Sequence, residues 1–185
     1  MVRVERKTKE VEVIAKLSFD GGEIKANTGI GFLDHMLTTL AFHSGMGLEL
    51  SAKGDLQVDE HHTVEDIAIV LGKAFRKALE DKKNIRRFGS AIVPMDESVA
   101  MCGVDVSGRG YFVLEGEFGD AGIKEENVIH FLDTFCRNSG VNVYIQVRGR
   151  NSHHKIESSF KALALSLREA LKSFEGVRST KGKID

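Results

Sequence analysis

Short stretches in which apolar and polar residues alternate are followed by stretches with an apolar residue every three or four positions. Residues 11–19 alternate as a half-buried strand does, and residues 32–41 carry an apolar stripe typical of a helix that packs on a core. A Ser-Gly pair is expected to end that helix, and the LELSAKG segment that follows predicts another strand. A long helix is predicted from near His61, with these residues on its core side: Val64, Ile67, Ala68, Leu71, Phe75 and Ala78.

The second half of the chain repeats this order. ESVAMCGVDVS and YFVLEGEF predict a pair of neighbouring strands, and VNVYIQVRG predicts a further strand. Two helices are marked by their apolar positions: Val128, Leu132 and Phe135 in one, and Ile156, Phe160, Leu163, Leu167, Leu171 and Phe174 in the other. With one proline (Pro94) and no long linker, we expect two fused α+β lobes, each a mostly antiparallel sheet with helices on one face.

Two sequence patterns occur twice, in the same order. HMLTTLAFHSG, which begins at His35, matches HFLDTFCRNSG, which begins at His130, and HHTVE (61–65) matches HHKIE (153–157). The interval between the two patterns is slightly shorter in the second half, and such length differences are tolerated in loops. The chain therefore contains an internal duplication of about ninety residues. We expect a single domain built of two repeats, about 1–90 and 91–185.

Composition narrows the classes of protein to consider. Of the 185 residues, 42% are hydrophobic and 29% are charged, which is typical of a globular domain. The net charge of −1 provides no field that would draw the chain to nucleic acid or to an anionic membrane. No apolar run approaches the roughly 20 residues that cross a bilayer, and MVRVERKTKE resembles neither a signal nor a transit peptide. The chain has only two cysteines, Cys102 and Cys136, so no disulfide framework is expected. We therefore expect the protein to lie in the reducing cytoplasm.

The repeated histidines and glutamates have the spacing of metal ligands. Residues four apart share one face of a helix, so His61 and Glu65 can bind one ion while His62 points elsewhere. In the second repeat, His153, His154 and Glu157 have the same geometry. The two upstream histidines, His35 and His130, bring the total to six histidines and two glutamates. This total divides into two sites of three His and one Glu each, which suit a divalent transition ion with open positions for substrate. Manganese fits an octahedral catalytic role, while iron, cobalt and zinc also accept these ligand types.

A single His pair at the start of a helix is more often a cap or a subunit contact than a metal site. Its repetition, with a further matching histidine each time, favours metal binding. His43 is left out of the set because Asn138 stands at its place in the second repeat. Since the adjacent His61 and His62 diverge, we expect one subunit to complete a site on another, within a symmetric homo-oligomer.

Longer segments resemble a known enzyme family. TGIGFLDHMLTTLAFHSG, DEHHTVEDIAIVLGKAF, IRRFGSAIVPMDES, NSHHKIESSFKALALSLREAL and RSTKG are similar to segments of the imidazoleglycerol-phosphate dehydratases of histidine biosynthesis. The similarity covers nearly the whole chain, and the paired HHxxE blocks are highly specific. The resemblance implies lobes related to the second domain of ribosomal protein S5, two Mn²⁺ ions per active site and a shell of 24 subunits. No phosphatase domain precedes Met1, so the monofunctional form is expected.

The resemblance also implies a reaction. The family removes water from imidazole glycerol phosphate to give imidazole acetol phosphate. The proton to be removed is not next to a carbonyl, so metal ions on both ring nitrogens would stabilise the charge that the imidazole gains. By the resemblance, Glu10 performs acid–base work beside the substrate, and His62 and His154 belong to the catalytic set.

The substrate's phosphate group requires several converging cations and donors. By the resemblance, the candidates are Arg87, Arg109, Lys161, Ser179 and Lys181, of which Lys161 is the weaker because Ile69 takes its place in the first repeat. The same pocket should be lined by His35, His61, His62 and Glu65. Asp96 and Glu97 of the PMDES segment are expected to orient neighbouring groups rather than to react.

Two other functions would use a similar ligand set. A dinuclear metallohydrolase also binds its ions through His and Glu, but it needs a metal-activated water beside a scissile bond. A metal-storage shell would saturate its ions with protein ligands and would leave Arg87, Arg109 and Lys181 without a role. The dehydratase alone predicts that the open metal positions accept an azole.

Overall fold

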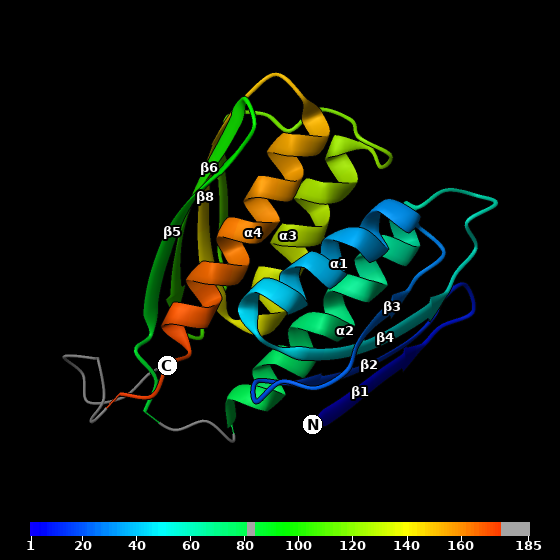
Figure 1. Ribbon diagram of the computed structural model, residues 1–185. Coiled ribbons are helices and arrows are strands. Elements are labelled where there is room, and N and C mark those ends of the chain that lie inside the picture. Colours follow the sequence, from blue (N-terminus) through cyan, green and yellow to red (C-terminus); the bar gives the residue numbers. More distant parts are fainter. Residues whose placement is uncertain (81–83, 175–185) are drawn as a thin grey trace.

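The computed structural model describes residues 1–80 and 84–174 and contains two sheets with four helices between them (Figure 1). In chain order the elements are β1 (Val2–Lys7), β2 (Glu12–Ser18), β3 (Ile24–Asn27), α1 (Gly31–Ser44), β4 (Gly47–Lys53), α2 (His61–Glu80), β5 (Phe88–Met95), β6 (Ser98–Val106), β7 (Phe112–Glu115), α3 (Glu125–Ser139), β8 (Val141–Arg148) and α4 (Ser152–Ala170). The same order of strands and helices occurs twice along the chain.

The two sheets have the same topology. Their strand orders are β1-β2-β4-β3 and β5-β6-β8-β7, with one parallel pair in each, β3 with β4 and β7 with β8. All other neighbours are antiparallel. These paired lobes confirm the predicted α+β fold with mostly antiparallel sheets.

One prediction about strand pairing was wrong. Residues 98–106 and 112–115 do form strands, but β6 and β7 are not neighbours, because β8 lies between them. A parallel neighbour requires a crossover connection, and α3 supplies it between β7 and β8. Alternation in a sequence reports which side chains a strand buries, and it does not report the strand's neighbours.

Helices from the two lobes pack against each other. Within the lobes, α1 and α2 cover the first sheet, and α3 and α4 cover the second. Across the lobes, α1 packs on α4 and α2 packs on α3, so the helices fill the middle of the molecule (Figure 1). Every helix of one lobe therefore has a partner in the other, and the helix faces meet in a single shared core.

Aromatic side chains form much of this shared core. Phe75 of α2 meets Phe135 of α3 edge to face, with ring centroids 5.7 Å apart, and Phe131 of α3 stacks near Phe160 of α4 at 6.1 Å. All four side chains are almost completely buried. Such pairs contribute about 1 kcal/mol each beyond the area that they bury. The Phe75–Phe135 pair helps to hold the two lobes in one relative position, whereas the Phe131–Phe160 pair joins α3 to α4 within the second lobe.

The ends of α1 and α3 show how closely the repeats correspond. Each helix ends at the predicted Ser-Gly pair, and the glycines, Gly45 and Gly140, have φ angles of 76° and 77°. This left-handed conformation favours glycine because it has no Cβ. Each glycine turns the chain directly into the strand that follows, β4 or β8.

No helix in the described part of the chain is long and apolar enough to cross a membrane. Cys102 and Cys136 are both free and buried. Burial raises the pKa of the Cys102 thiol to about 12, and it also raises the pKa of Cys136. Both cysteines therefore remain protonated thiols at neutral pH and serve as core residues.

Gly72 provides a test of the helix packing between lobes. A Cβ at Gly72 of α2 would lie 2.6 Å from Cβ of Asn138 and 2.9 Å from the carbonyl oxygen of Phe135, both on α3. Gly72→Ala should therefore lower the free energy of unfolding by about 1–3 kcal/mol, although alanine normally favours a helix. The control is Gly31→Ala in α1, where a Cβ meets nothing within 4 Å. Chemical unfolding of the metal-free variants measures the difference, and an unchanged stability of Gly72→Ala would contradict this packing.

Candidate metal centres and active site

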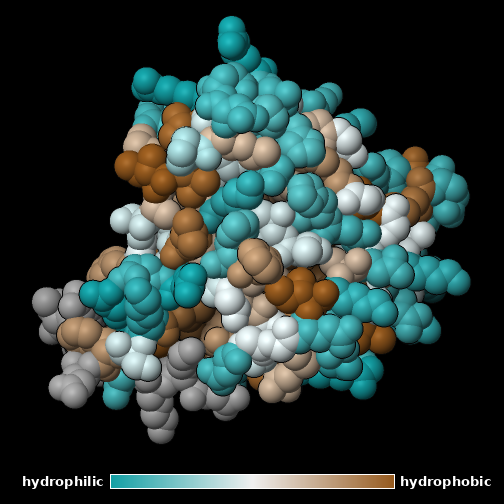
Figure 2. All heavy atoms as spheres, in the orientation of Figure 1, coloured by the Kyte–Doolittle hydropathy of each residue, from teal (hydrophilic) through white to brown (hydrophobic). Residues whose placement is uncertain are grey.

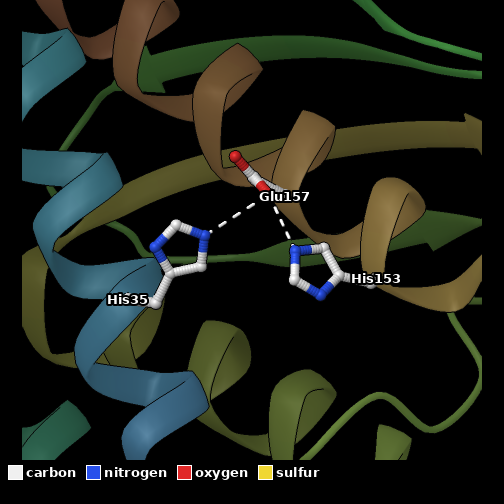
Figure 3. A group of neighbouring side chains, drawn as sticks. All are labelled: His35, His153 and Glu157. Atoms are coloured by element: carbon white, nitrogen blue, oxygen red, sulfur yellow. Dashed lines mark hydrogen bonds and ion pairs between the residues drawn. The ribbon is translucent and has the colours of Figure 1, made fainter.

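The first group of side chains that could hold a metal ion lies where α1 packs on α4. His35 projects from α1 toward His153 and Glu157 of α4 (Figure 3). The Glu157 Oε2 atom is 2.9 Å from His153 Nε2 and 3.4 Å from His35 Nε2. One ligand atom from each residue lies within 4.8 Å of the others. The three donors thus surround one small volume and come from both lobes.

The second group lies where α2 packs on α3, and it repeats the first. His61 and Glu65 of α2 face His130 of α3, whose Nε2 atom is 3.6 Å from Glu65 Oε1. The rings of His61 and His130 stack with centroids 4.6 Å apart. In each repeat the upstream histidine therefore joins the HHxxE segment of the other repeat, not that of its own.

The donor atoms of both groups fit a divalent transition ion. Mixed imidazole nitrogen and carboxylate oxygen is a ligand set typical of manganese, iron, cobalt or zinc. Burial opposes ionisation of Glu157, but hydrogen bonds from Lys161, His153 and His35 outweigh it and lower its pKa to about 2. The carboxylate is therefore negatively charged at neutral pH and can bind a cation. His130 Nε2 is a buried atom with no hydrogen-bond partner in the described part of the chain, as expected of a ligand atom.

His62 and His154 point away from these two groups. His62 Nδ1 lies 3.6 Å from Glu10 Oε2 and 3.7 Å from Asp55 Oδ2. His154 Nδ1 lies 2.8 Å from Glu97 Oε2, and its Nε2 lies 3.7 Å from Asp96 Oδ2. A single chain thus brings together two histidines and one glutamate at each site, and leaves one histidine of each expected set outside.

Helix geometry explains this divergence. The HH pairs stand in the first turns of α2 and α4, where successive side chains are rotated by about 100°. Asn151 caps α4 by accepting a hydrogen bond from the backbone N–H of His154. The cap fixes the start of the helix, and hence which histidine faces α1 and which faces the β5–β6 hairpin.

The two arginines predicted for the phosphate lie together, but far from the histidines. Arg87 binds Asp105 through Nε at 2.7 Å and Nη2 at 3.2 Å, and Arg109 lies 3.5 Å from the same carboxylate. The Arg87 N–H bonds to the carbonyl of Ala170, at the opposite end of α4 from His153. That separation is about 25 Å along the helix. One chain therefore does not unite the arginines with its own histidine groups.

Arg87 also has a backbone conformation that is rare for a residue with a side chain. Its φ is 72°, and its N–H and carbonyl are held by hydrogen bonds to Ala170 and Val106. Such strain costs about 1–3 kcal/mol and is commonly found at functional sites. The surrounding structure thus fixes the direction of the Arg87 side chain.

Of the remaining predicted residues, two lie in the described part of the chain and two lie outside it. Lys161 lies at the first group, with its Nζ 2.8 Å from Glu157 Oε1. Glu10 lies beside His62 on the tip between β1 and β2. Ser179 and Lys181 lie outside the described residues.

Sequence reasoning did not single out Asp55, which lies in the connection between β4 and α2. One of its carboxylate oxygens, Oδ1, is buried without a hydrogen-bond partner in the described chain, and the other is near His62. The only signal in the sequence is an acidic residue shortly before the HH pair, and acidic residues are common in loops. Its proximity to His62 follows from the way the connection folds back.

Comparisons with known proteins point to one enzyme family. Residues 28–167 match the family model described as imidazoleglycerol-phosphate dehydratase. Relatives with that name are 56% identical in Archaeoglobus fulgidus, over all of both chains, and 50% identical in Methanothermobacter thermautotrophicus, over 97% of this chain and 95% of the relative. The crystal structure of IGPD from Pyrococcus furiosus in complex with (S)-C348 has a TM-score of 0.84 at 37% identity and covers 97% of this chain and 99% of that one.

Removing a histidine from the first group tests whether it holds an ion. His35→Ala should lower the affinity for Mn²⁺ at the α1–α4 group by more than about tenfold, because a lost ligand costs at least as much as a lost supporting hydrogen bond. His43→Ala, on the same helix but outside both groups, should bind Mn²⁺ as the unmodified chain does. Titration of the chelated proteins, with free Mn²⁺ followed by electron paramagnetic resonance, measures both. Equal binding by the two variants would contradict the assignment.

Proposed function

The chain belongs to the imidazoleglycerol-phosphate dehydratase family, and from this membership we propose how its own residues hold the metal ions and the substrate. The reaction is the metal-dependent dehydration of imidazole glycerol phosphate to imidazole acetol phosphate, a hydro-lyase step of histidine biosynthesis. The observation that carries the proposal is the duplicated His-His-Glu group at the interface of the lobes. Membership of the family sets aside the metallohydrolase and the storage shell.

The proposed metal ligands follow the two groups. His35, His153 and Glu157 would hold one ion, and His61, Glu65 and His130 would hold the other. Following the resemblance to the family, we assign Mn²⁺, two ions per active site, and the nitrogen and oxygen donors are compatible with it. When bound, the ions supply positive charge that stabilises the imidazole ring as it becomes electron-rich. His62 and His154 would complete the ligand sets of neighbouring subunits, because they point out of their own groups.

Glu10 is proposed to move protons during the reaction. Its carboxylate is 59% exposed at the tip of a hairpin, within 3.6 Å of His62 Nδ1, so it can reach a substrate beside that histidine. Glu10 would accept the proton from the carbon next to the one that loses its hydroxyl group. Glu10 would first donate a proton to the departing hydroxyl group, which leaves as water, so the proton that it then accepts from carbon restores its starting state. The enol that remains tautomerises to the ketone. His62 and His154 would act in the same pocket.

The phosphate group is proposed to bind Arg87, Arg109, Ser179 and Lys181, with Lys161 beside Glu157 as a further cation. Arg87 and Arg109 converge on Asp105, and a planar guanidinium pair is well suited to phosphate oxygens. Since these arginines lie about 25 Å from His153 along α4, the arginines of one subunit would serve the histidines of another. Phosphate binding would position the substrate for the chemistry.

The outer faces of the two sheets support a proposal of homo-oligomerisation. The second sheet exposes apolar residues that are neighbours across strands, with Ile92 opposite Met101 and Val113 opposite Tyr144. The outer face of the first sheet is charged instead: Arg3, Glu5, Lys16 and Glu49 lie there. Figure 2 shows hydrophobic atoms gathered toward the side where Figure 1 places β5 and β6. A contiguous apolar patch of this kind is typical of an interface.

From the resemblance to the family we further propose that the assembly has 24 subunits and lies in the cytoplasm. Each subunit would be one catalytic domain of two repeats, about 1–90 and 91–185. This proposal is supported by the separation of the outlying histidines and of the arginines from the two groups within one chain, which an assembly would bridge.

Turnover tests the function directly. The purified chain loaded with Mn²⁺ should convert imidazole glycerol phosphate to imidazole acetol phosphate, and exhaustive chelation should abolish the conversion. Glu10→Gln should lower kcat by about 10²–10⁴-fold, the usual contribution of a general acid or base. Glu5→Gln, an exposed carboxylate on β1, is the control and should leave kcat unchanged. Equal rates for the two variants would remove Glu10 from the mechanism.

The proposed interface has its own test. Ile92→Lys should lower the mass of the assembly measured by light scattering, because a charge buried in an apolar interface is strongly unfavourable. Ile14→Lys makes the same change at the first sheet, beside Glu5, and should leave the mass unaltered. An unchanged mass for Ile92→Lys would place the contact between subunits elsewhere.

A further inference from the structure

The hairpins β1–β2 and β5–β6 occupy the same place in the two repeats. Leu48 and Val143 are both the third residue after the glycine that ends the preceding helix, and they pair with Leu17 and Val104. Counting back equally far from these two partners leads to the tips of the hairpins, to Glu10 in one repeat and Glu97 in the other. Glu10 and Glu97 are therefore equivalent by the duplication, and each lies beside the second histidine of its own HH pair.

The two equivalent carboxylates differ in their hydrogen bonds and in their exposure to solvent. Glu97 accepts hydrogen bonds from His154 Nδ1 at 2.8 Å, the Asn151 N–H at 2.8 Å, the Ser98 hydroxyl at 2.9 Å and the Arg150 N–H at 3.3 Å. These four donors fix the carboxylate in one position. Glu10 is more exposed than Glu97, with 59% of its side chain accessible against 26%, and its Oε2 lies 3.6 Å from His62 Nδ1.

A different carboxylate lies at His62 in the first repeat. Asp55, before α2, has a side chain only 17% exposed, and its Oδ2 lies 3.7 Å from His62 Nδ1. His62 Nδ1 and Asp55 Oδ1 are both buried atoms without a hydrogen-bond partner in the described part of the chain. A small rotation of either side chain would join this donor and this acceptor, and would satisfy both groups.

We propose that Glu97 and Asp55 are positioning residues, each of which fixes the second histidine of an HH pair so that Nε2 faces a metal ion. An ionised carboxylate only accepts hydrogen bonds, so a histidine that binds it through Nδ1 carries its proton there. The lone pair is then on Nε2, the atom left to coordinate a metal. If Asp55 fixes His62, Glu10 of the first repeat does not have to bind that histidine, and its carboxylate stays available for proton transfer. This inference rests on the proposed role of both histidines as metal ligands.

A purely structural role for Glu97 is the competing explanation, since it also joins the hairpin to the start of α4. Glu97→Gln separates the two roles. The amide oxygen of glutamine can still accept from the backbone N–H groups of Arg150 and Asn151. The amide can also donate to Nδ1 of His154, which moves the ring proton to Nε2 and blocks the ligand atom.

Metal affinity is the first measurement. Glu97→Gln and Asp55→Asn should each weaken Mn²⁺ binding by about 10–100-fold, the usual effect of removing a carboxylate behind a ligating histidine. Glu10→Gln, the equivalent position in the duplication, is the matched control and should stay within about twofold of the unmodified chain. In a His154→Ala background, the Glu97→Gln change should have no further effect on affinity, since the residue through which it acts is gone.

The position of the ring proton is the second measurement, and a structural role would not move it. Nitrogen-15 NMR of histidine-labelled, metal-free protein, at a pH well above the ordinary histidine pKa of about 6.5, distinguishes the two tautomers. The His154 signal, assigned by its loss in His154→Ala, should report Nδ1–H in the unmodified chain and Nε2–H in Glu97→Gln. The Asp55→Asn variant keeps the test valid if Glu97→Gln lowers the melting temperature of the metal-free protein.

The outcomes separate this inference from the proposed function. An unmodified chain that binds no Mn²⁺ would overturn the metal assignment itself. Normal binding by the unmodified chain, together with affinities within twofold for Glu97→Gln and Asp55→Asn, would overturn the positioning role alone. An Nε2–H tautomer of His154 in the unmodified chain would do the same.

Discussion

The packing of each helix on a partner from the other lobe is the constraint on which the site depends. His35 belongs to the first repeat and meets His153 and Glu157 of the second, while His130 of the second meets the first. Neither group exists within one lobe. The packing of α1 on α4 and of α2 on α3, which includes the Phe75–Phe135 contact, sets how these helices approach each other, so a hydrophobic interface positions the side chains of both groups.

This arrangement would also couple the proposed metal binding to the stability of the chain. Each group concentrates histidines around a carboxylate at the lobe interface, and Glu157 is kept ionised there by its neighbours, including Lys161. An ion bound by ligands from both lobes binds the folded chain and not the separated helices, so its binding free energy adds to the free energy of unfolding. The hydrophobic interface positions the ligands, and the proposed ions would in turn hold that interface together.

The sequence predicted the parts of this design that depend on local periodicity. The four helices, the Ser-Gly ends of α1 and α3, and the sharing of a face by His61 and Glu65 all follow from positions within a few residues of one another. The strands β1, β3 and β5 were missed, and all three lie at sheet edges. In β1 only Val2 and Val4 are partly buried, and β5 alternates in burial but carries apolar residues on its exposed face as well, so neither strand shows an alternation of apolar and polar residues in the sequence. The exchange of ligands between repeats and the proximity of Asp55 to His62 depend on tertiary packing, which no local pattern records.

Duplication explains why the site is symmetric, and divergence explains why it can be catalytic. Two identical repeats would place equivalent carboxylates beside His62 and His154, and both carboxylates would have the same hydrogen bonds and the same role. In this chain the carboxylate of Glu97 is fixed by four donors, whereas that of Glu10 remains largely in solvent. A group held by four hydrogen bonds is strongly favoured as an anion and is a poor proton acceptor, whereas an exposed carboxylate can exchange protons. The outer faces of the sheets diverged in a similar way, one charged and one apolar. The same fold, used twice, would thus provide matched ligands for the two proposed ions, together with unmatched groups for the proposed proton transfer and association.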